Sequence, residues 1–157
     1  METIKSEKLD SKFKDEVAAC PGGENIRLCF ACGACTATCP VAGVCADFNP
    51  RRIIRQVLLG QREEVLQSPL LWQCMQCYAC TVKCPQNVKF RDIAKALRAL
   101  AVKYGYATEE LSAERENWNQ LILQVQRDGV TWLTSDRARY QDLKKQLESG
   151  LINDKKE

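Results

Sequence analysis

Two cysteine blocks constrain this 157-residue chain more than any other feature of its sequence. Residues 29–40 read CFACGACTATCP and residues 74–85 read CMQCYACTVKCP, so both have the spacing C-x2-C-x2-C-x3-C-P. Every cysteine and the proline of the first block recur 45 positions later. A repeat of this kind predicts two similar structural units that bind the same kind of group.

Each block is followed by a predicted helix that ends at a glycine. In the first, Asn49 is the expected N-cap, Pro50 takes the first helical position and Gly60 follows the last turn. The second is predicted from about Phe90 to Tyr104, before Gly105, because its apolar residues recur at helical spacing. Its predicted apolar face consists of Phe90, Ile93, Ala94, Leu97, Leu100, Ala101 and Tyr104.

The flanking segments also show helical patterns. Leu9, Phe13 and Val17 form a short amphipathic stripe before the first block. A further helix is expected to begin at 108–110 and to stop at Gly129. Its predicted buried face is Leu111, Trp118, Leu121, Ile122 and Val125, and a last helix is predicted to bury Tyr140, Leu143, Leu147 and Leu151. No segment alternates with the period of a strand, so the sequence predicts an all-α fold.

The cysteine spacing is that of loops that hold cubane [4Fe–4S] clusters. Three cysteines spaced by two residues can curl around one cluster, and small residues such as Gly33, Ala34 and Ala79 let the backbone approach the sulfurs. The fourth cysteine of such a block ligates the other cluster in two-cluster ferredoxins. We therefore expect two [4Fe–4S] clusters, each with ligands from both blocks. The predicted ligands are Cys29, Cys32, Cys35 and Cys84 for cluster 1, and Cys74, Cys77, Cys80 and Cys39 for cluster 2.

Zinc and disulfides are the alternative uses of so many cysteines. Zinc ribbons use two separated cysteine pairs and not a run of four closed by proline. Clustered cysteines in a reducing cytosol more often bind metal or carry out redox chemistry than form disulfides. Of the ten cysteines, Cys20 and Cys45 lie outside the blocks, and we expect both to be buried apolar thiols.

The rest of the composition excludes several classes of function. The chain has no histidine, which excludes histidine-based catalytic triads and histidine metal ligands. No apolar run approaches the roughly 20 residues of a membrane helix. The charged N-terminal residues 1–20 do not read as a signal peptide, so a cytoplasmic protein is expected. The formal net charge of +3 gives no case for nucleic-acid binding, and Arg51, Arg52, Arg55 and Arg62 are interpreted as a solvated face that offsets cluster charge.

The arrangement resembles the C subunit of heterodisulfide reductase and its bacterial relatives. The residues that carry the resemblance are 21–41, with PGGENIRLCFACGACTATCPV, and 50–66, 71–88 and 91–105. The resemblance implies an α-helical ferredoxin with two cubane cluster loops and flanking N- and C-terminal helices. We expect an N-terminal helical arm (1–20), a two-cluster ferredoxin domain (21–106) and a C-terminal helical extension (107–157).

The resemblance also implies a function. Such a subunit relays electrons from a flavin-containing A subunit, or another donor, to a B subunit with cysteine-rich CCG domains that reduces a disulfide. The chain itself would hold no catalytic residues, because it has neither a CCG motif nor GxGxxG. Two alternatives remain open: a relay subunit of another CCG-containing oxidoreductase (2-hydroxy-acid or quinone-linked), and a stand-alone ferredoxin-like carrier. A nucleic-acid-binding cluster protein is disfavoured because no recognition-helix signature is found.

Overall fold

The computed structural model describes residues 9–153, with side chains up to residue 150. Contacts divide the chain into two compact units, with the boundary between Ser112 and Ala113. The division predicted from the sequence, at residues 20/21 and 106/107, stays a prediction. Each unit is described by itself below.

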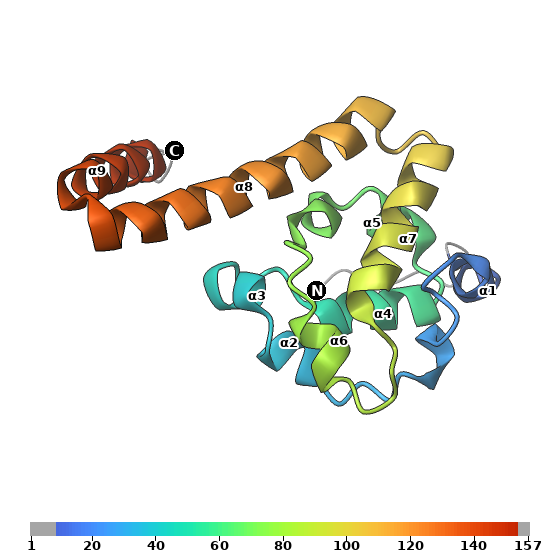
Figure 1. Cartoon of the computed structure of the whole chain (residues 1–157). Helices are drawn as coiled ribbons and strands as arrows, with labels where there is room; N and C mark the ends of the chain where they lie inside the picture. Colours follow the sequence, from blue (N-terminus) through green and yellow to red (C-terminus); the bar gives the residue numbers. More distant parts are fainter. Residues whose placement is uncertain (1–8, 154–157) are drawn as a thin grey trace. The chain divides into compact units, whose positions relative to one another are not determined.

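All regular structure in residues 9–153 is helical, which confirms the all-α prediction (Figure 1). The elements up to the second cysteine block are α1 (Phe13–Ala19), the 3-10 helix η2 (Ile26–Leu28), α2 (Ala34–Ala37), α3 (Pro40–Val44), α4 (Pro50–Leu58), α5 (Arg62–Leu66) and η3 (Pro69–Gln73). They are followed by α6 (Ala79–Lys83), α7 (Phe90–Lys103), α8 (Glu109–Ser135) and α9 (Arg137–Asn153).

The core of the first unit includes residues of α1, α4 and α7, and α1 packs against both α4 and α7. Phe13 and Val17 of α1 are fully buried in it. The predicted apolar face is therefore confirmed at these two residues. It is wrong at Leu9, which precedes the helix and is 38% exposed. Residues 1–8, the start of the predicted N-terminal arm, lie outside the described residues.

The helices that follow the two blocks begin and end as predicted. The Asn49 side chain accepts a hydrogen bond from the Arg52 N–H and caps α4, with Pro50 at the first position. Gly60 and Gly105 both adopt left-handed conformations, with φ of 81° and 74°. After each glycine the next residue donates to the carbonyl five residues back, Gln61 to Gln56 and Tyr106 to Ala101, which is the Schellman pattern. The repeat thus extends beyond the cysteines.

Helix α7 crosses the core with one long buried face. The face includes the predicted Phe90, Ile93 and Leu97, all at most 2% exposed. Tyr104 is an exception, because it follows the last helical residue and is 45% exposed. Arg98 is a second exception, as a charged side chain buried on this face.

The second unit differs from its prediction. Helix α8 continues through Gly129 to Ser135, so this glycine does not end the helix. A side chain at Gly129 would meet Leu143 of α9 at 3.7 Å, an ordinary van der Waals distance, so α9 packs beside this part of α8. The predicted buried face of α8 is not buried: Trp118 and Leu121 are 55% and 46% exposed, and no residue of α8 is buried.

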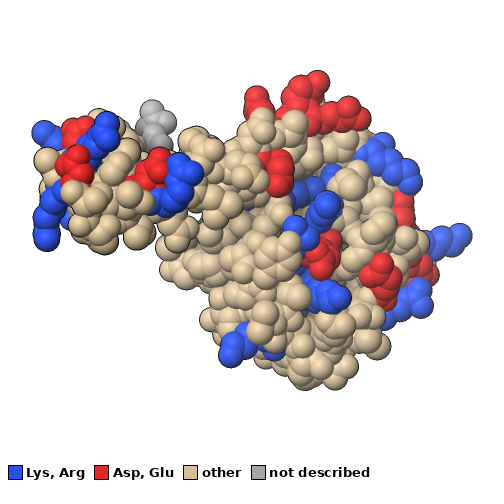
Figure 2. Space-filling view, in the orientation of Figure 1, with Lys and Arg blue, Asp and Glu red and all other residues tan. Residues whose placement is uncertain are grey.

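In α9, Tyr140 and Leu143 are half-buried and Leu147 is 46% exposed, while the Leu151 side chain lies outside the described residues. Neither these helices nor any other within the described residues combines the length and apolar character that a membrane crossing requires. Positive and negative side chains are interspersed on the face drawn in Figure 2, beside a broad uncharged area of the first unit.

Candidate iron–sulfur centres

The two cysteine loops have the same backbone conformation at equivalent positions. Ala31 and Gln76, which precede the second cysteine of each block, have φ of 58° and 59°. Gly33 and Tyr78, which follow that cysteine, have φ of 87° and 63°. Left-handed residues placed between right-handed or extended ones turn successive N–H groups into one concavity that attracts negative charge. The sequence predicted a close approach of the backbone at Gly33, Ala34 and Ala79, and of these only Gly33 is left-handed.

The loops are brought together by the short helices that follow them. Helix α2 comes after Gly33 and α6 comes after Tyr78, and these two helices pack against each other (Figure 1). The third cysteine of each block, Cys35 or Cys80, lies within these helices. Packing of α2 on α6 therefore places the two blocks face to face, which lets each supply a ligand to the other.

One recess gathers the four cysteines predicted for cluster 2. Its lining contains Cys74, Cys77 and Cys80 of the second block together with Cys39 of the first. The recess is narrow, with a cavity volume of about 10 Å³. The remaining lining residues are Val41, Pro50, Met75, Gln76, Tyr78, Phe90 and Arg91. We call this cavity the second-block recess.

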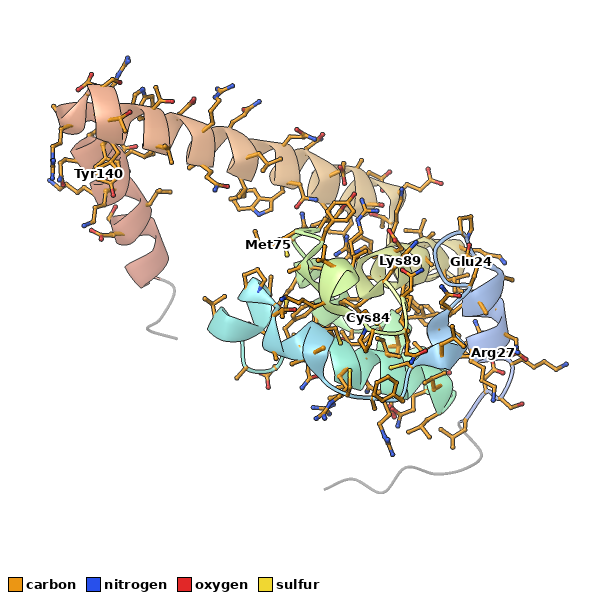
Figure 3. All side chains as sticks on the ribbon, turned by 60° about the horizontal axis from the view of Figure 1, so that its bottom comes forward. Glu24, Arg27, Met75, Cys84, Lys89 and Tyr140 are labelled. Atoms are coloured by element: carbon orange, nitrogen blue, oxygen red, sulfur yellow. The ribbon has the colours of Figure 1, made fainter. Side chains whose placement is uncertain are left out.

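Of the cysteines predicted for cluster 1, Cys29, Cys32 and Cys35 belong to the first block and Cys84 belongs to the second. Cys29 and Cys35 lie within electrostatic reach of each other. Cys29 also lines a recess of about 150 Å³ with Arg51 and Arg55. Cys84 is half-buried in the first unit (Figure 3), where its Sγ accepts a hydrogen bond of 3.3 Å from the Val88 N–H. Cys32, like its counterpart Cys77, is exposed, so each block has one cysteine at the surface.

Burial disfavours the charged form of the inner thiols. It raises the pKa of Cys35 to about 11 and also raises the pKa of Cys74 and Cys80. Cysteine binds metal as the thiolate, so these groups need positive charge at the site to become ligands at neutral pH. Iron in the loops would supply that charge.

The donor set fits [4Fe–4S] clusters. Soft thiolates in two such loops are the ligands that these clusters take, and the left-handed turns add N–H donors for sulfur. The Nε of Arg91, which lines the second-block recess, is buried and has no hydrogen-bond partner among the described residues. Within the same part of the chain, no three cysteine or carboxylate side chains are placed to hold a single metal ion.

Sequence reasoning missed the buried Arg98 beside the second block. Its Nε donates to the Leu71 carbonyl over 3.0 Å and its Nη2 to the Cys74 carbonyl over 3.1 Å. Its guanidinium carbon lies 5.6 Å from the centre of the Trp72 ring. Arg98 comes four residues after the buried Ala94, and this charged residue within an apolar helical stripe was the available signal.

Arg62 does not belong to the exposed basic face to which the sequence assigned it. Its guanidinium pairs with Asp10 at 2.7 Å and with Glu16, whereas Arg51, Arg52 and Arg55 are exposed. The two cysteines outside the blocks, Cys20 and Cys45, are half-buried and pack against the core, so the prediction of buried thiols is only partly met. Cys20 Sγ donates to the Glu16 carbonyl at 3.4 Å.

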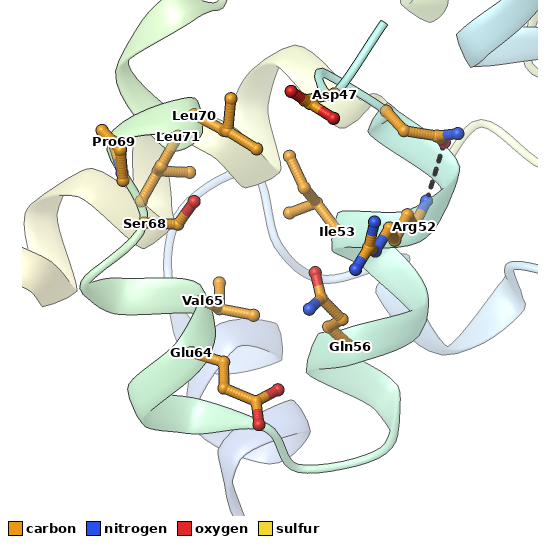
Figure 4. A pocket seen from close by; sticks show the side chains of 11 residues that line it. Asp47, Arg52, Ile53, Gln56, Glu64, Val65, Ser68, Pro69, Leu70 and Leu71 are labelled. Carbon is orange, nitrogen blue, oxygen red and sulfur yellow. Dashed lines mark hydrogen bonds between the residues drawn. The ribbon is translucent and has the colours of Figure 1, made fainter. Parts of the chain in front are cut away.

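A larger hollow of about 380 Å³ lies between α4, α5 and η3 (Figure 4). Asp47, Arg52 and Glu64 bring charged groups to it, and Ile53 and Val65 contribute apolar surface. It contains no cysteine, so it is separate from the iron–sulfur site.

Comparison with known proteins agrees with this geometry. The profile of the 4Fe–4S dicluster domain family matches residues 10–88. The chain is 37% identical over 103 residues to the C subunit of the H(2):CoB-CoM heterodisulfide,ferredoxin reductase of Methanothermobacter thermautotrophicus, which covers 66% of this chain and 55% of the relative. It is 42% identical over 92 residues to the C subunit of the ferredoxin:CoB-CoM heterodisulfide reductase of Methanosarcina acetivorans, covering 59% and 36% of the two chains.

A third relative is the iron–sulfur C subunit of the CoB–CoM heterodisulfide reductase of Methanopyrus kandleri, with 39% identity over 101 residues, 64% of this chain and 50% of the relative. The chain spans about half the length of the curated relatives it matches. The resemblance stated from the sequence is confirmed, as are the two [4Fe–4S] clusters and the helical ferredoxin fold. The paired cysteine loops, the packing of α2 on α6 and the match over residues 10–88 thus place this chain in the 4Fe–4S dicluster domain family.

Proposed function

We propose that this chain is the electron-transfer subunit of a heterodisulfide-reductase-type complex. Its partners would be a flavin-containing A subunit, or another electron donor, and a B subunit whose CCG domains carry the disulfide-reducing site. The similarity to three C subunits supports the electron-transfer role. When bound, two [4Fe–4S] clusters accept and pass on single electrons.

The ligand assignment is part of the proposal. Cys29, Cys32, Cys35 and Cys84 would hold cluster 1, and Cys74, Cys77, Cys80 and Cys39 would hold cluster 2. The observation that carries it is the second-block recess, whose lining contains Cys39 together with three of the four cysteines of the other block. A ligand taken from each opposite block ties the halves together and keeps the two clusters close enough to exchange electrons.

The loops also provide contact surfaces. Phe30 and Met75 occupy equivalent positions after the first cysteine of each block and are 61% and 43% exposed. An exposed cysteine and an exposed apolar side chain therefore flank each predicted cluster. Such edges suit transient contact with one electron donor and one acceptor. Cytoplasmic location remains part of the proposal, in keeping with ten free cysteines.

The test is an oxygen-free affinity purification of the tagged chain from its own cells. Co-purified proteins are identified, and iron, acid-labile sulfide and flavin are counted. We expect a CCG-domain subunit and a flavoprotein, with more iron than the roughly eight atoms that this chain can bind. Recovery of a different CCG-containing oxidoreductase would move the chain to that complex. Recovery of the chain alone with about eight irons would make it a stand-alone carrier.

A further inference from the structure

The two cysteine loops differ at one position where their backbones agree. The left-handed residue after the second cysteine is Gly33 in the first loop and Tyr78 in the second. A residue other than glycine costs roughly 1 kcal/mol in this conformation. The tyrosine is 49% exposed, so burial of its ring alone does not account for it.

An arginine lies beside each of these positions. Arg51 is the second residue of α4 and Arg91 is the second residue of α7. Arg51 Nη1 is 3.7 Å from the point that a side chain on Gly33 would occupy. The guanidinium carbon of Arg91 is 4.5 Å from the centre of the Tyr78 ring. The two arginines are therefore structural counterparts, one for each loop.

The residue at the left-handed position, glycine or tyrosine, decides how much of the neighbouring arginine is exposed to water. Arg51 is exposed, and no aromatic ring of the described residues lies over its guanidinium. Arg91 lies under Tyr78 with only 18% of its side chain exposed, and it is held by Asp92 at 2.7 Å and by Gln76 at 2.9 Å. Its Nε is buried and has no hydrogen-bond partner in the described part of the chain, and Arg91 is one of the residues that line the second-block recess.

We propose that Tyr78 and Arg91 together raise the reduction potential of cluster 2 above that of cluster 1, so that electrons run from the first cysteine block to the second. This rests on the proposed two-cluster relay. Arg91 Nε–H supplies a hydrogen bond to sulfur at cluster 2, and the partly buried guanidinium adds positive charge that water screens less than it screens an exposed charge. Hydrogen bonds to sulfur, local charge and solvent exposure are the terms that set the potential of such clusters.

The charges near the two arginines change the size of the difference in reduction potential between the clusters but not its sign. Asp92 pairs with Nη1 of Arg91 and offsets part of the positive charge. The hydrogen bond from Nε does not depend on that pair. At cluster 1, Arg51 and Arg55 are exposed, and water screens exposed charges strongly. An arginine therefore lies beside each loop, but of these two only Arg91 is shielded from water.

The experiment is a reductive titration of the purified chain, followed by electron paramagnetic resonance. Variants Cys39→Ser and Cys84→Ser, each expected to keep one cluster, assign the signals. In Arg91→Gln and in Tyr78→Gly, which copies the first loop, cluster 2 should become harder to reduce. We expect the equilibrium constant for sharing one electron between the clusters to fall at least tenfold, which is 59 mV.

Two controls separate this effect from a structural one. Arg51→Gln removes the exposed counterpart and should shift that constant less than about twofold, since its charge is screened. Tyr78→Phe keeps an aromatic ring over Arg91 and should leave the equilibrium constant for electron sharing unchanged. The proposal is overturned if Arg91→Gln keeps its full iron content and the same difference in reduction potential between the clusters. It is also overturned if Arg51→Gln shifts that difference as much as Arg91→Gln does. Wild-type chain with fewer than about eight irons would refute the two-cluster function instead.

Discussion

Arg98 Nη2 donates a hydrogen bond of 3.1 Å to the carbonyl oxygen of Cys74, so a buried guanidinium holds the first cysteine of the second block. The same side chain donates to the Leu71 carbonyl at 3.0 Å. Both carbonyls belong to the segment that leads into the second loop. The core helix α7 thereby positions the loop through a side chain that only the tertiary structure identifies.

Replacing Arg98 with Met should loosen the second loop. The variant removes one charged donor from two carbonyls, and we expect a loss of about 3 kcal/mol in the free energy of unfolding. Anaerobic circular dichroism and iron analysis measure this, with reduced iron retention expected as well. Arg55→Met is the matched control, because an exposed arginine of this kind should change stability by no more than about 0.5 kcal/mol.

Exchange of ligands between the blocks predicts an unusual pattern of iron loss. Cys39→Ser should remove cluster 2 even though Cys39 belongs to the first block, because this residue lines the second-block recess. About four of eight irons should remain, with the spectrum of Cys74→Ser. Cys84→Ser should remove the other cluster. If the spectrum of Cys39→Ser instead resembles that of Cys29→Ser, the assignment of one ligand from each block to the opposite cluster is wrong. Cys45→Ser should retain about eight irons.

The ion network of Arg62 predicts a defined sensitivity to acid. A hydrogen bond from Arg62 lowers the pKa of Asp10. Burial alone would raise the pKa of Glu16, but hydrogen bonds from Tyr104 and Arg62 outweigh it and lower this pKa too. Both groups thus stabilise the fold above their ordinary pKa values of 3.8 and 4.5, and this stability is lost as pH falls through the folded values.

The measurement is thermal unfolding of the wild type and Glu16→Gln from pH 7 down to below pH 4.5. The wild type should be more stable at pH 7, and the difference should shrink as the pH decreases. At pH 7, Arg62→Gln should lower the melting temperature by roughly 4–8 °C, as expected for a loss of about 2 kcal/mol. A difference that stays constant with pH would show that Glu16 acts without its charge.

Gly60 and Gly105 form a matched pair in the repeat. Both are left-handed, so alanine should cost roughly 1 kcal/mol of backbone strain at either position. A side chain at Gly60 would in addition lie 2.4 Å from the Asp10 carbonyl oxygen, whereas nothing lies within 4 Å at Gly105. Gly60→Ala should therefore destabilise the fold by about 2 kcal/mol more than Gly105→Ala. Equal melting temperatures for the two variants would contradict the close approach of Asp10 and α4.

Much of the site was predictable because it depends on local patterns. Cysteine spacing indicates the cluster type, Asn49-Pro50 predicts the start of α4, and Gly60 and Gly105 predict helix ends. Each of these is a preference of a few neighbouring residues. The predicted stop at Gly129 is wrong because glycine in a helix carries only a modest penalty, and α8 continues through it while α9 packs close by.

The sequence by itself determined the all-α class, the two-cluster chemistry and the repeat, since these follow from residue type and spacing. Only the tertiary structure decided which side chains lie beside each cysteine block. Arg91 and Arg51 look equivalent as second residues of their helices, yet Arg91 is partly buried under Tyr78 and Arg51 is exposed beside Gly33. Burial depends on contacts between residues distant in the chain, and it sets how strongly a charge acts on its neighbours. Spacing along the chain does not contain that information.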